Sequence, residues 1–157
     1  MKKYFSILTA VILAALTMSL TACGDDNDEP ENTNPKALIG TWESVLAQDL
    51  IEAMDGIWES GEQLFQFRSD GTAISVNYYV LSDYMAELEG HKEEIDIQYC
   101  TWEANGNMIY VVDEEGYTNQ YKYTIKGDKL TLTLTKGIEI PVTFKRVSDS
   151  RINKYLD

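Results

Sequence analysis

Hydrophobic and polar residues alternate along most of the chain between Leu38 and Val147, as expected for β-strands that bury one face. The clearest run is 130–135, where three leucines alternate with three threonines. Short runs of turn-forming residues separate the strands, among them Asp70-Gly71, and such pairs supply the positive φ angles that tight hairpins need. The pattern predicts an all-β domain made of consecutive hairpins.

The alternation and the turns together predict eight strands. Their ranges are 38–45, 63–68, 72–81, 95–104, 108–112, 117–126, 130–135 and 138–146. Strands joined in order by short turns pair with their sequence neighbours, and closing the sheet removes its free edges. The expected fold is an eight-stranded antiparallel up-and-down barrel, with a two-sheet sandwich or an open half-barrel as the structural alternatives. Such a barrel has room inside for side chains or for one small ligand.

Two segments depart from the alternation. Residues 49–60 carry apolar residues at helical spacing and end at Gly61, which predicts a short amphipathic helix after the first strand. The helix could cover one end of the barrel or pack as an ordinary core helix. Residues 82–94 are acidic and predict one or two helical turns around Tyr84, Met85 and Leu88. This connection is either a rim of the barrel or a plain surface excursion.

The N-terminal residues 1–22 have the features of an export signal. Lys2 and Lys3 precede an apolar run over 5–20, which is short for a membrane-spanning helix of about 20 apolar residues. Leu20-Thr21-Ala22-Cys23 resembles the bacterial lipobox. The resemblance implies that Cys23 becomes the mature N-terminus and carries the lipid that holds the protein to a membrane. The alternative is a secretory signal that happens to end in cysteine.

Residues 23–36 read as a disordered tether, because they are polar and mostly acidic and cannot bury enough apolar surface to fold. Acidic residues directly after the lipobox cysteine resemble the export tag of surface lipoproteins in the Bacteroidetes. The resemblance implies an outer-membrane lipoprotein exposed at the cell surface. A plain solvated tether on the periplasmic face is the alternative.

The charge balance excludes one class of partner. The chain of 157 residues carries a formal charge of −13, and without Lys2 and Lys3 eleven basic residues face 26 acidic ones, which gives −15. A field of this sign repels phosphate backbones and anionic lipids. We expect no nucleic-acid partner, and membrane contact through the lipid at Cys23 alone.

The residue types needed for catalysis or metal binding are scarce. With Cys23 acylated, Cys100 is the only free thiol, so no internal disulfide is expected, and His91 is the only histidine. A cysteine nucleophile needs a positioned base, and a zinc site needs several imidazole or thiolate ligands. We expect no enzyme, no metal and no cofactor, and we expect Cys100 to be a small buried hydrophobe.

The two ends of the predicted barrel carry residues that fit one another. Trp42 points inward from the first strand, and Arg146 falls on the inward side of the last strand. A tryptophan ring is the best aromatic partner for a guanidinium group. Together with Gly40 and the 67–72 hairpin, these residues resemble the lipocalins (calycins), and more closely the lipocalin-like domains of bacterial lipoproteins.

The lipocalin resemblance covers about 38–147. It implies that Gly40, Trp42 and Arg146 pack together to close one end of the barrel. Three features depart from the family: an Asp-containing turn between later strands has no match, the usual disulfide cannot form, and the helix at 49–60 replaces a simple loop. The resulting domain organisation is a signal peptide (1–22), a tether (23–36), a barrel (37–148) and a polar C-terminal tail (149–157).

Two functions fit this organisation. The first is binding of a small apolar or amphipathic molecule at the open end of the barrel. By parity, the candidate lining residues are Phe65, Phe67, Tyr78, Trp102, Tyr121 and Tyr123. Ordinary core packing is the alternative role for each, since small barrels fill themselves with side chains. The second function is a cell-surface interaction lipoprotein with a filled barrel, whose loops, including 82–94, contact a protein or glycan.

Overall fold

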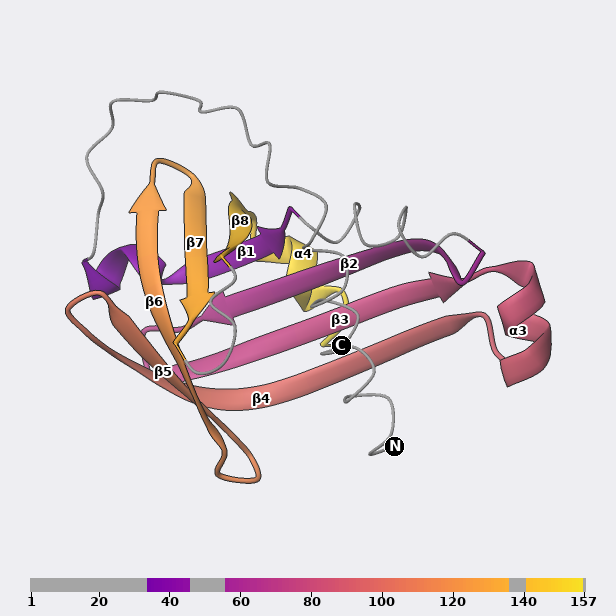
Figure 1. The fold of residues 1–157 in the computed structure, drawn as a ribbon, viewed down its shortest axis with the longest axis horizontal. Coiled ribbons are helices and arrows are strands. Elements are labelled where there is room, and N and C mark those ends of the chain that lie inside the picture. Colours follow the sequence, from indigo (N-terminus) through magenta and orange to yellow (C-terminus); the bar gives the residue numbers. More distant parts are fainter. Residues whose placement is uncertain (1–33, 46–55, 136–140, 157) are drawn as a thin grey trace.

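Eight antiparallel strands close into one barrel in sequence order (Figure 1). The computed structural model describes residues 34–45, 56–135 and 141–156. The strands are β1 (Gly40–Ser44), β2 (Trp58–Phe67), β3 (Thr72–Leu81), β4 (Glu93–Asn105), β5 (Met108–Asp113), β6 (Thr118–Lys126), β7 (Lys129–Leu134) and β8 (Pro141–Val147). Because β1 pairs with both β2 and β8, the sheet closes on itself. The predicted up-and-down barrel is confirmed, and the sandwich and half-barrel alternatives are wrong.

Three short helical segments accompany the strands in the described residues: η1 (Pro35–Leu38), α3 (Asp83–Glu89) and α4 (Ser150–Asn153). The helical turns predicted within 82–94 are confirmed as α3. The hydroxyl of Ser82 accepts a hydrogen bond from the Met85 N–H at 3.3 Å, and Gly90 ends the helix with a φ of 76°. These capping residues explain where α3 begins and ends.

The helix predicted over 49–60 is wrong at its C-terminal end. Residues 46–55 lie outside the described part of the chain, but β2 already begins at Trp58. Trp58 pairs with Leu81 of β3, and its ring stacks on Tyr79 with 4.8 Å between centroids. The long β3 offers backbone partners to these residues, so the pairing with β3 prevails over the helical spacing of the apolar side chains.

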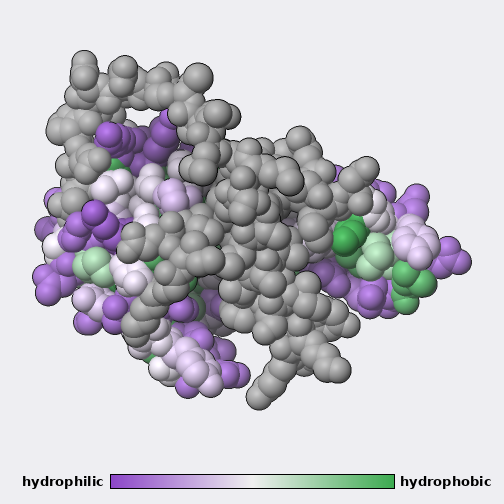
Figure 2. Space-filling model, in the orientation of Figure 1, coloured by the Kyte–Doolittle hydropathy of each residue, from purple (hydrophilic) through white to green (hydrophobic). Residues whose placement is uncertain are grey.

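The strands differ greatly in length. Strands β2 and β3 have 10 residues each and β4 has 13, whereas β5 and β7 have 6. In Figure 1, β2, β3 and β4 run together well past the other strands towards α3. The barrel is therefore extended on one side by a three-stranded sheet. Figure 2 shows a hydrophobic surface at the α3 end of the extension, where Leu88 is exposed.

The closed end of the barrel, where β1 begins, is filled by a hydrophobic core. Its buried members are Leu38, Trp42, Phe67, Ala73, Ile109, Val111, Tyr123, Ile125, Leu130, Leu132 and Phe144. Strand β4 adds the partly buried Cys100, Trp102 and Ala104. Each large side chain removed from water contributes about 1.5–3 kcal/mol, so this half of the barrel carries much of the stability.

A second apolar cluster lies on the outer face of β2 and β3. It joins Leu64, Ile74 and Val76 to Ile152 of α4, and all four side chains are almost fully buried. The prediction that residues 149–157 form a polar tail is therefore wrong. A single buried residue in a polar segment gives too weak a periodic signal to be recognised in the sequence.

Polar contacts fix the position of the α4 segment on the sheet. Arg151 donates to the carboxylates of Glu43 at 2.6 Å and Glu62 at 3.0 Å, and the Tyr155 hydroxyl donates to Glu62 at 3.0 Å. These groups are partly exposed, and such pairs contribute about 0–1 kcal/mol each. Burial of Ile152 is therefore the main term that holds α4 in place.

Candidate functional site

The closed end of the barrel is sealed by Trp42 and Arg146 from the neighbouring strands β1 and β8. The guanidinium carbon of Arg146 lies 4.0 Å from the centroid of the Trp42 ring. Its two terminal nitrogens donate to the carbonyls of Ile39, at 2.9 Å, and Ala37, and the Trp42 indole N–H donates to Leu38 O at 2.7 Å. The contact that the lipocalin resemblance implied is confirmed.

Gly40 makes the approach of Arg146 possible. Its φ is 127°, a conformation that other residues rarely adopt, and a Cβ atom there would lie 2.7 Å from Arg146 Nη1. Gly40, Trp42 and Arg146 thus form a structural unit that closes the barrel.

Five of the six candidate lining residues face the barrel interior, where they take part in the core. Phe67 and Tyr123 are buried members of the core, and Phe65, Trp102 and Tyr121 pack against it while partly buried. Phe67 contacts Phe65 with 4.8 Å and Trp102 with 5.1 Å between ring centroids. The closed half of the barrel is thus packed with side chains.

Tyr78 lies on the other face of the sheet, so its parity assignment is wrong. On β3 the core residue is Ala73, and Ser75, Asn77 and Tyr79 share its inward face. The Tyr78 ring packs against Tyr155 outside the barrel, with 5.1 Å between centroids. The apolar residues of β3 face outward because α4 covers them there.

Polar side chains take the interior positions between the core and the open end, a feature that sequence reasoning missed. Ser44 of β1 and Asn77 of β3 are 5% and 7% exposed. Pairing of Glu43 with Leu64 and of Gln63 with Asn77 places Gln63 between them across β2. Ser44 Oγ and Asn77 Oδ1 are buried and have no hydrogen-bond partner among the residues that the structure describes. Buried polar groups in folded proteins usually have a hydrogen-bond partner, either in the protein or in ordered water.

Tyr79 continues the polar inner face of β3 towards the open end. The pKa of its hydroxyl is raised from 10 to about 12. Burial is the largest cause, and the nearby carboxylates of Asp96 and Glu94 contribute to the same rise. Both carboxylates belong to β4, whose residues 94 and 96 pair with Tyr79 and Asn77. The open end therefore has a negative potential on its β4 side.

The raised pKa of Tyr79 predicts a loss of stability at alkaline pH. Because the folded-state pKa of about 12 exceeds the ordinary value of 10, the contribution is complete below about pH 10 and is lost as the pH rises through 12. We expect the free energy of unfolding to fall by about 2 kcal/mol in this window on account of Tyr79. Urea unfolding at a series of pH values measures the fall.

Tyr79→Phe lacks the titrating hydroxyl and should show a correspondingly smaller alkaline decline. Tyr84→Phe is the matched control, because Tyr84 is 69% exposed. Equal pH profiles for the Tyr79→Phe variant and the unmodified chain would contradict the assignment.

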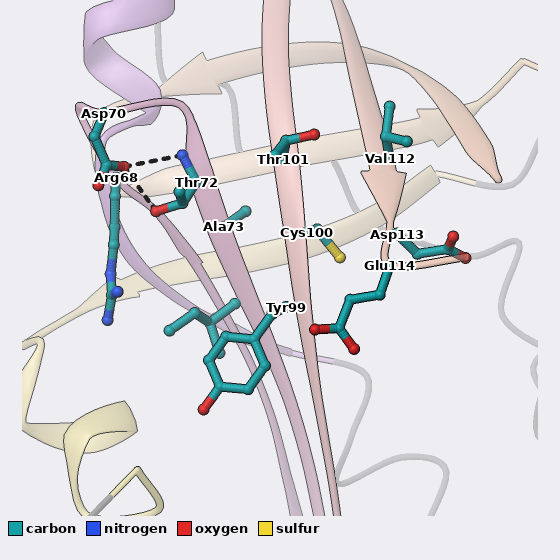
Figure 3. A pocket seen from close by; sticks show the side chains of 11 residues that line it. Arg68, Asp70, Thr72, Ala73, Tyr99, Cys100, Thr101, Val112, Asp113 and Glu114 are labelled. Carbon is teal, nitrogen blue, oxygen red and sulfur yellow. Dashed lines mark hydrogen bonds between the residues drawn. The ribbon is translucent and has the colours of Figure 1, made fainter. Parts of the chain in front are cut away.

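A hollow of about 400 Å³ opens on the surface where β5 separates from β4 (Figure 3). In that view the Tyr99 ring lies between the side chains of Arg68 and Glu114. Cys100 also lines the hollow. Burial raises the pKa of its thiol, and the charges of Asp113 and Glu114 raise that pKa further. The thiol stays protonated and is a poor nucleophile.

His91 and Lys92 lie at the tip of the extension, beside α3. The imidazole of His91 lies 3.3 Å from a Glu94 oxygen, and the ammonium group of Lys92 donates to Glu59 at 2.9 Å and to Asp83 at 2.7 Å. The Lys92 contacts tie β2, α3 and β4 together. In the described part of the chain, no three His, Cys, Asp or Glu side chains are grouped so that they could hold a metal ion.

Comparison with known proteins found no family model that matches the chain, no similar curated protein and no similar solved structure. None of the helices in the described ranges is both long enough and apolar enough to cross a membrane. Cys23 and the segments before residue 34 lie outside the described residues.

Proposed function

We propose that the chain is an exported, lipocalin-like lipoprotein of the outer membrane, anchored through Cys23, whose barrel binds one small amphipathic molecule without catalysing a reaction. The lipobox at 20–23 and the acidic residues that follow support the anchoring and the surface location. The observation that carries the binding function is the pair of buried atoms Ser44 Oγ and Asn77 Oδ1, which find no hydrogen-bond partner within the described ranges. A polar atom left without a partner in this way costs about 1–3 kcal/mol, which a ligand would recover.

The inward faces of the strands differ in polarity. Strands β1 to β3 carry Ser44, Gln63 and Asn77 there, whereas β5 and β7 carry apolar side chains of the core, among them Val111 and Leu132. The partly buried Tyr121 lies on the apolar side. A molecule with an apolar body and one hydrogen-bonding group would complement both the polar and the apolar side of the interior.

The charges around the site limit which head group a ligand can carry. Asn77 Oδ1 is an acceptor and needs a donor, while the carboxylates of Glu94 and Asp96 disfavour an anionic group nearby. A neutral hydroxyl or amide head group fits best. We expect dodecanol to bind more tightly than dodecanoate.

Asn77→Leu tests the proposal, because leucine cannot accept the hydrogen bond. In calorimetric titration of the soluble chain carrying Cys23→Ser, the variant should bind dodecanol about tenfold more weakly, the effect of one hydrogen bond of about 1.4 kcal/mol. Its stability should be unchanged or higher, since the unpartnered oxygen is gone.

Asn105→Leu makes the same change at an exposed position near the closed end and serves as the control. It should bind dodecanol like the parent chain. Equal affinity of the Asn77→Leu variant, or no binding of either probe to the parent chain, would rule out the proposed site.

A further inference from the structure

Strand β4 has a free edge along the one-sided extension of the barrel. It pairs with β3 from Glu93 to Thr101, but its pairing with β5 covers only Cys100 to Asn105. Within the described ranges no strand pairs with the other side of residues 93–99. At about 3.3 Å per residue, this edge is about 23 Å long.

The hydrogen-bond pattern identifies which backbone groups are free. Trp102 N–H donates to Gly71 O at 2.8 Å, and Lys92 O accepts from Leu81 N–H at 2.8 Å, so even-numbered residues of β4 point their peptide groups towards β3. The peptide groups of Glu93, Ile95, Ile97 and Tyr99 therefore point away from β3. These four residues present a row of donors and acceptors at the spacing of a strand.

The side chains along the edge combine exposed apolar surface with negative charge. Ile95 and Tyr99 are 52% and 50% exposed on the outer face. Glu93, Glu94 and Asp96 are exposed as well, and the hollow at the end of the edge is flanked by Asp113 and Glu114. Lys92, at one end of the edge, is paired with Glu59 and Asp83. Arg68, which lines the hollow at the other end, donates to the Gln66 side chain at 2.8 Å.

We propose that residues 93–99 of β4 bind a basic, extended peptide segment of a partner protein by strand addition. The free backbone groups supply the pairing, Ile95 and Tyr99 supply apolar contacts, and the carboxylates select a basic chain. A second copy of β4 would bring acidic residues of the two edges close together, which disfavours self-pairing. The chain's own acidic stretch at 25–31 has the same charge as the edge.

Amide hydrogen exchange, followed by NMR, tests the geometry without any substitution. The full-length protein in phosphatidylcholine nanodiscs is titrated with a peptide of alternating lysine and valine as long as the edge. The N–H groups of Glu93, Ile95, Ile97 and Tyr99 should exchange at least about tenfold more slowly on binding. The amides of 94, 96 and 98 already bond to β3 and should change little.

The alternation is decisive for strand addition. Protection that covers even and odd residues equally, or that is absent, would overturn the proposal. A glutamate–valine peptide of the same length should not bind, and binding of the lysine–valine peptide should weaken with added salt. Equal binding of both peptides, or pairing of β4 with β4 of another copy, would also overturn it.

Two variants of Ile95 distinguish the contribution of its backbone N–H to peptide binding from the contribution of its side chain. Ile95→Pro removes an outward N–H but leaves the ladder to β3, and edge strands tolerate proline. Ile95→Ala keeps the N–H and loses only the apolar contact. Fluorescence anisotropy of the labelled lysine–valine peptide should show affinity at least about tenfold weaker for the proline variant and less than about threefold weaker for alanine. Equal effects of the two variants, with both folded, would contradict pairing through the backbone.

Discussion

Replacing Trp42 by alanine should lower the free energy of unfolding by about 3–5 kcal/mol. The side chain is fully buried, its indole N–H donates to Leu38 O, and its ring carries the guanidinium group of Arg146. The substitution leaves a cavity and also removes the surface on which Arg146 lies. Urea unfolding followed by far-ultraviolet circular dichroism measures the loss.

Trp42→Phe and Arg146→Met divide this loss into its parts. Phenylalanine keeps an aromatic ring but has no N–H for Leu38 O. The free energy of unfolding of Trp42→Phe should therefore lie between those of the parent chain and of Trp42→Ala. Methionine retains an apolar chain over Trp42 but leaves the carbonyls of Ala37 and Ile39 without their donor. A loss below about 1 kcal/mol for Trp42→Ala would show that the closed end does not depend on this contact.

Replacing Ile152 by alanine should lower the free energy of unfolding by about 3 kcal/mol, within the range of about 2–5 for buried isoleucine. Ile152 is fully buried against Leu64, Ile74 and Val76, and it is the one buried residue of α4. Its truncation exposes an apolar strip of β2 and β3 to water. The same urea unfolding measurement determines the change.

Asn153→Ala is the matched control for Ile152→Ala, because Asn153 is exposed in the same helix. It should change the stability by less than about 0.5 kcal/mol. Limited proteolysis should also cleave the Ile152→Ala variant faster near its C-terminus, since α4 then undocks. If Ile152→Ala unfolds at the urea concentration of the parent chain, the α4 segment contributes nothing to the fold.

The barrel could be predicted because local signals agree with the global fold. The turns at Asp70-Gly71 and Asn105-Gly106 set the hairpins, and the leucine–threonine alternation of β7 marks one buried face. The contact between Trp42 and Arg146 followed from two inward positions and the preference of guanidinium groups for indole rings. Both signals depend on residues close in sequence or on simple parity.

The polar interior could not be predicted, because parity alone does not say which face of β3 is inside. Ile74 and Val76 are the more hydrophobic side of the strand, yet they pack against Ile152, while Ser75 and Asn77 face the barrel. A strand covered on both faces breaks the rule that the apolar side points to the core. Tyr78 was misplaced for the same reason.

The free edge of β4 was also hidden in the sequence. Turn residues show where hairpins reverse, but they do not show that β5 stops at Asp113 while β4 continues for 7 residues from 93 to 99. Strand lengths become comparable only when the register is known. The expectation that closing the barrel removes every free edge therefore holds for its closed half alone.

The seam between β1 and β8 has a consequence for folding kinetics. It joins residues about one hundred positions apart, such as Trp42 and Arg146, whereas the pairings from β2 through β8 are between successive strands. The entropy of closing a loop must be lost before its non-local contacts form, so we expect the seam to form after the rate-limiting step. The Trp42 variants should then unfold faster but refold at nearly the parent rate. The contacts at the closed end would then set the unfolding rate. The lifetime of the folded barrel would depend on the contact that forms last.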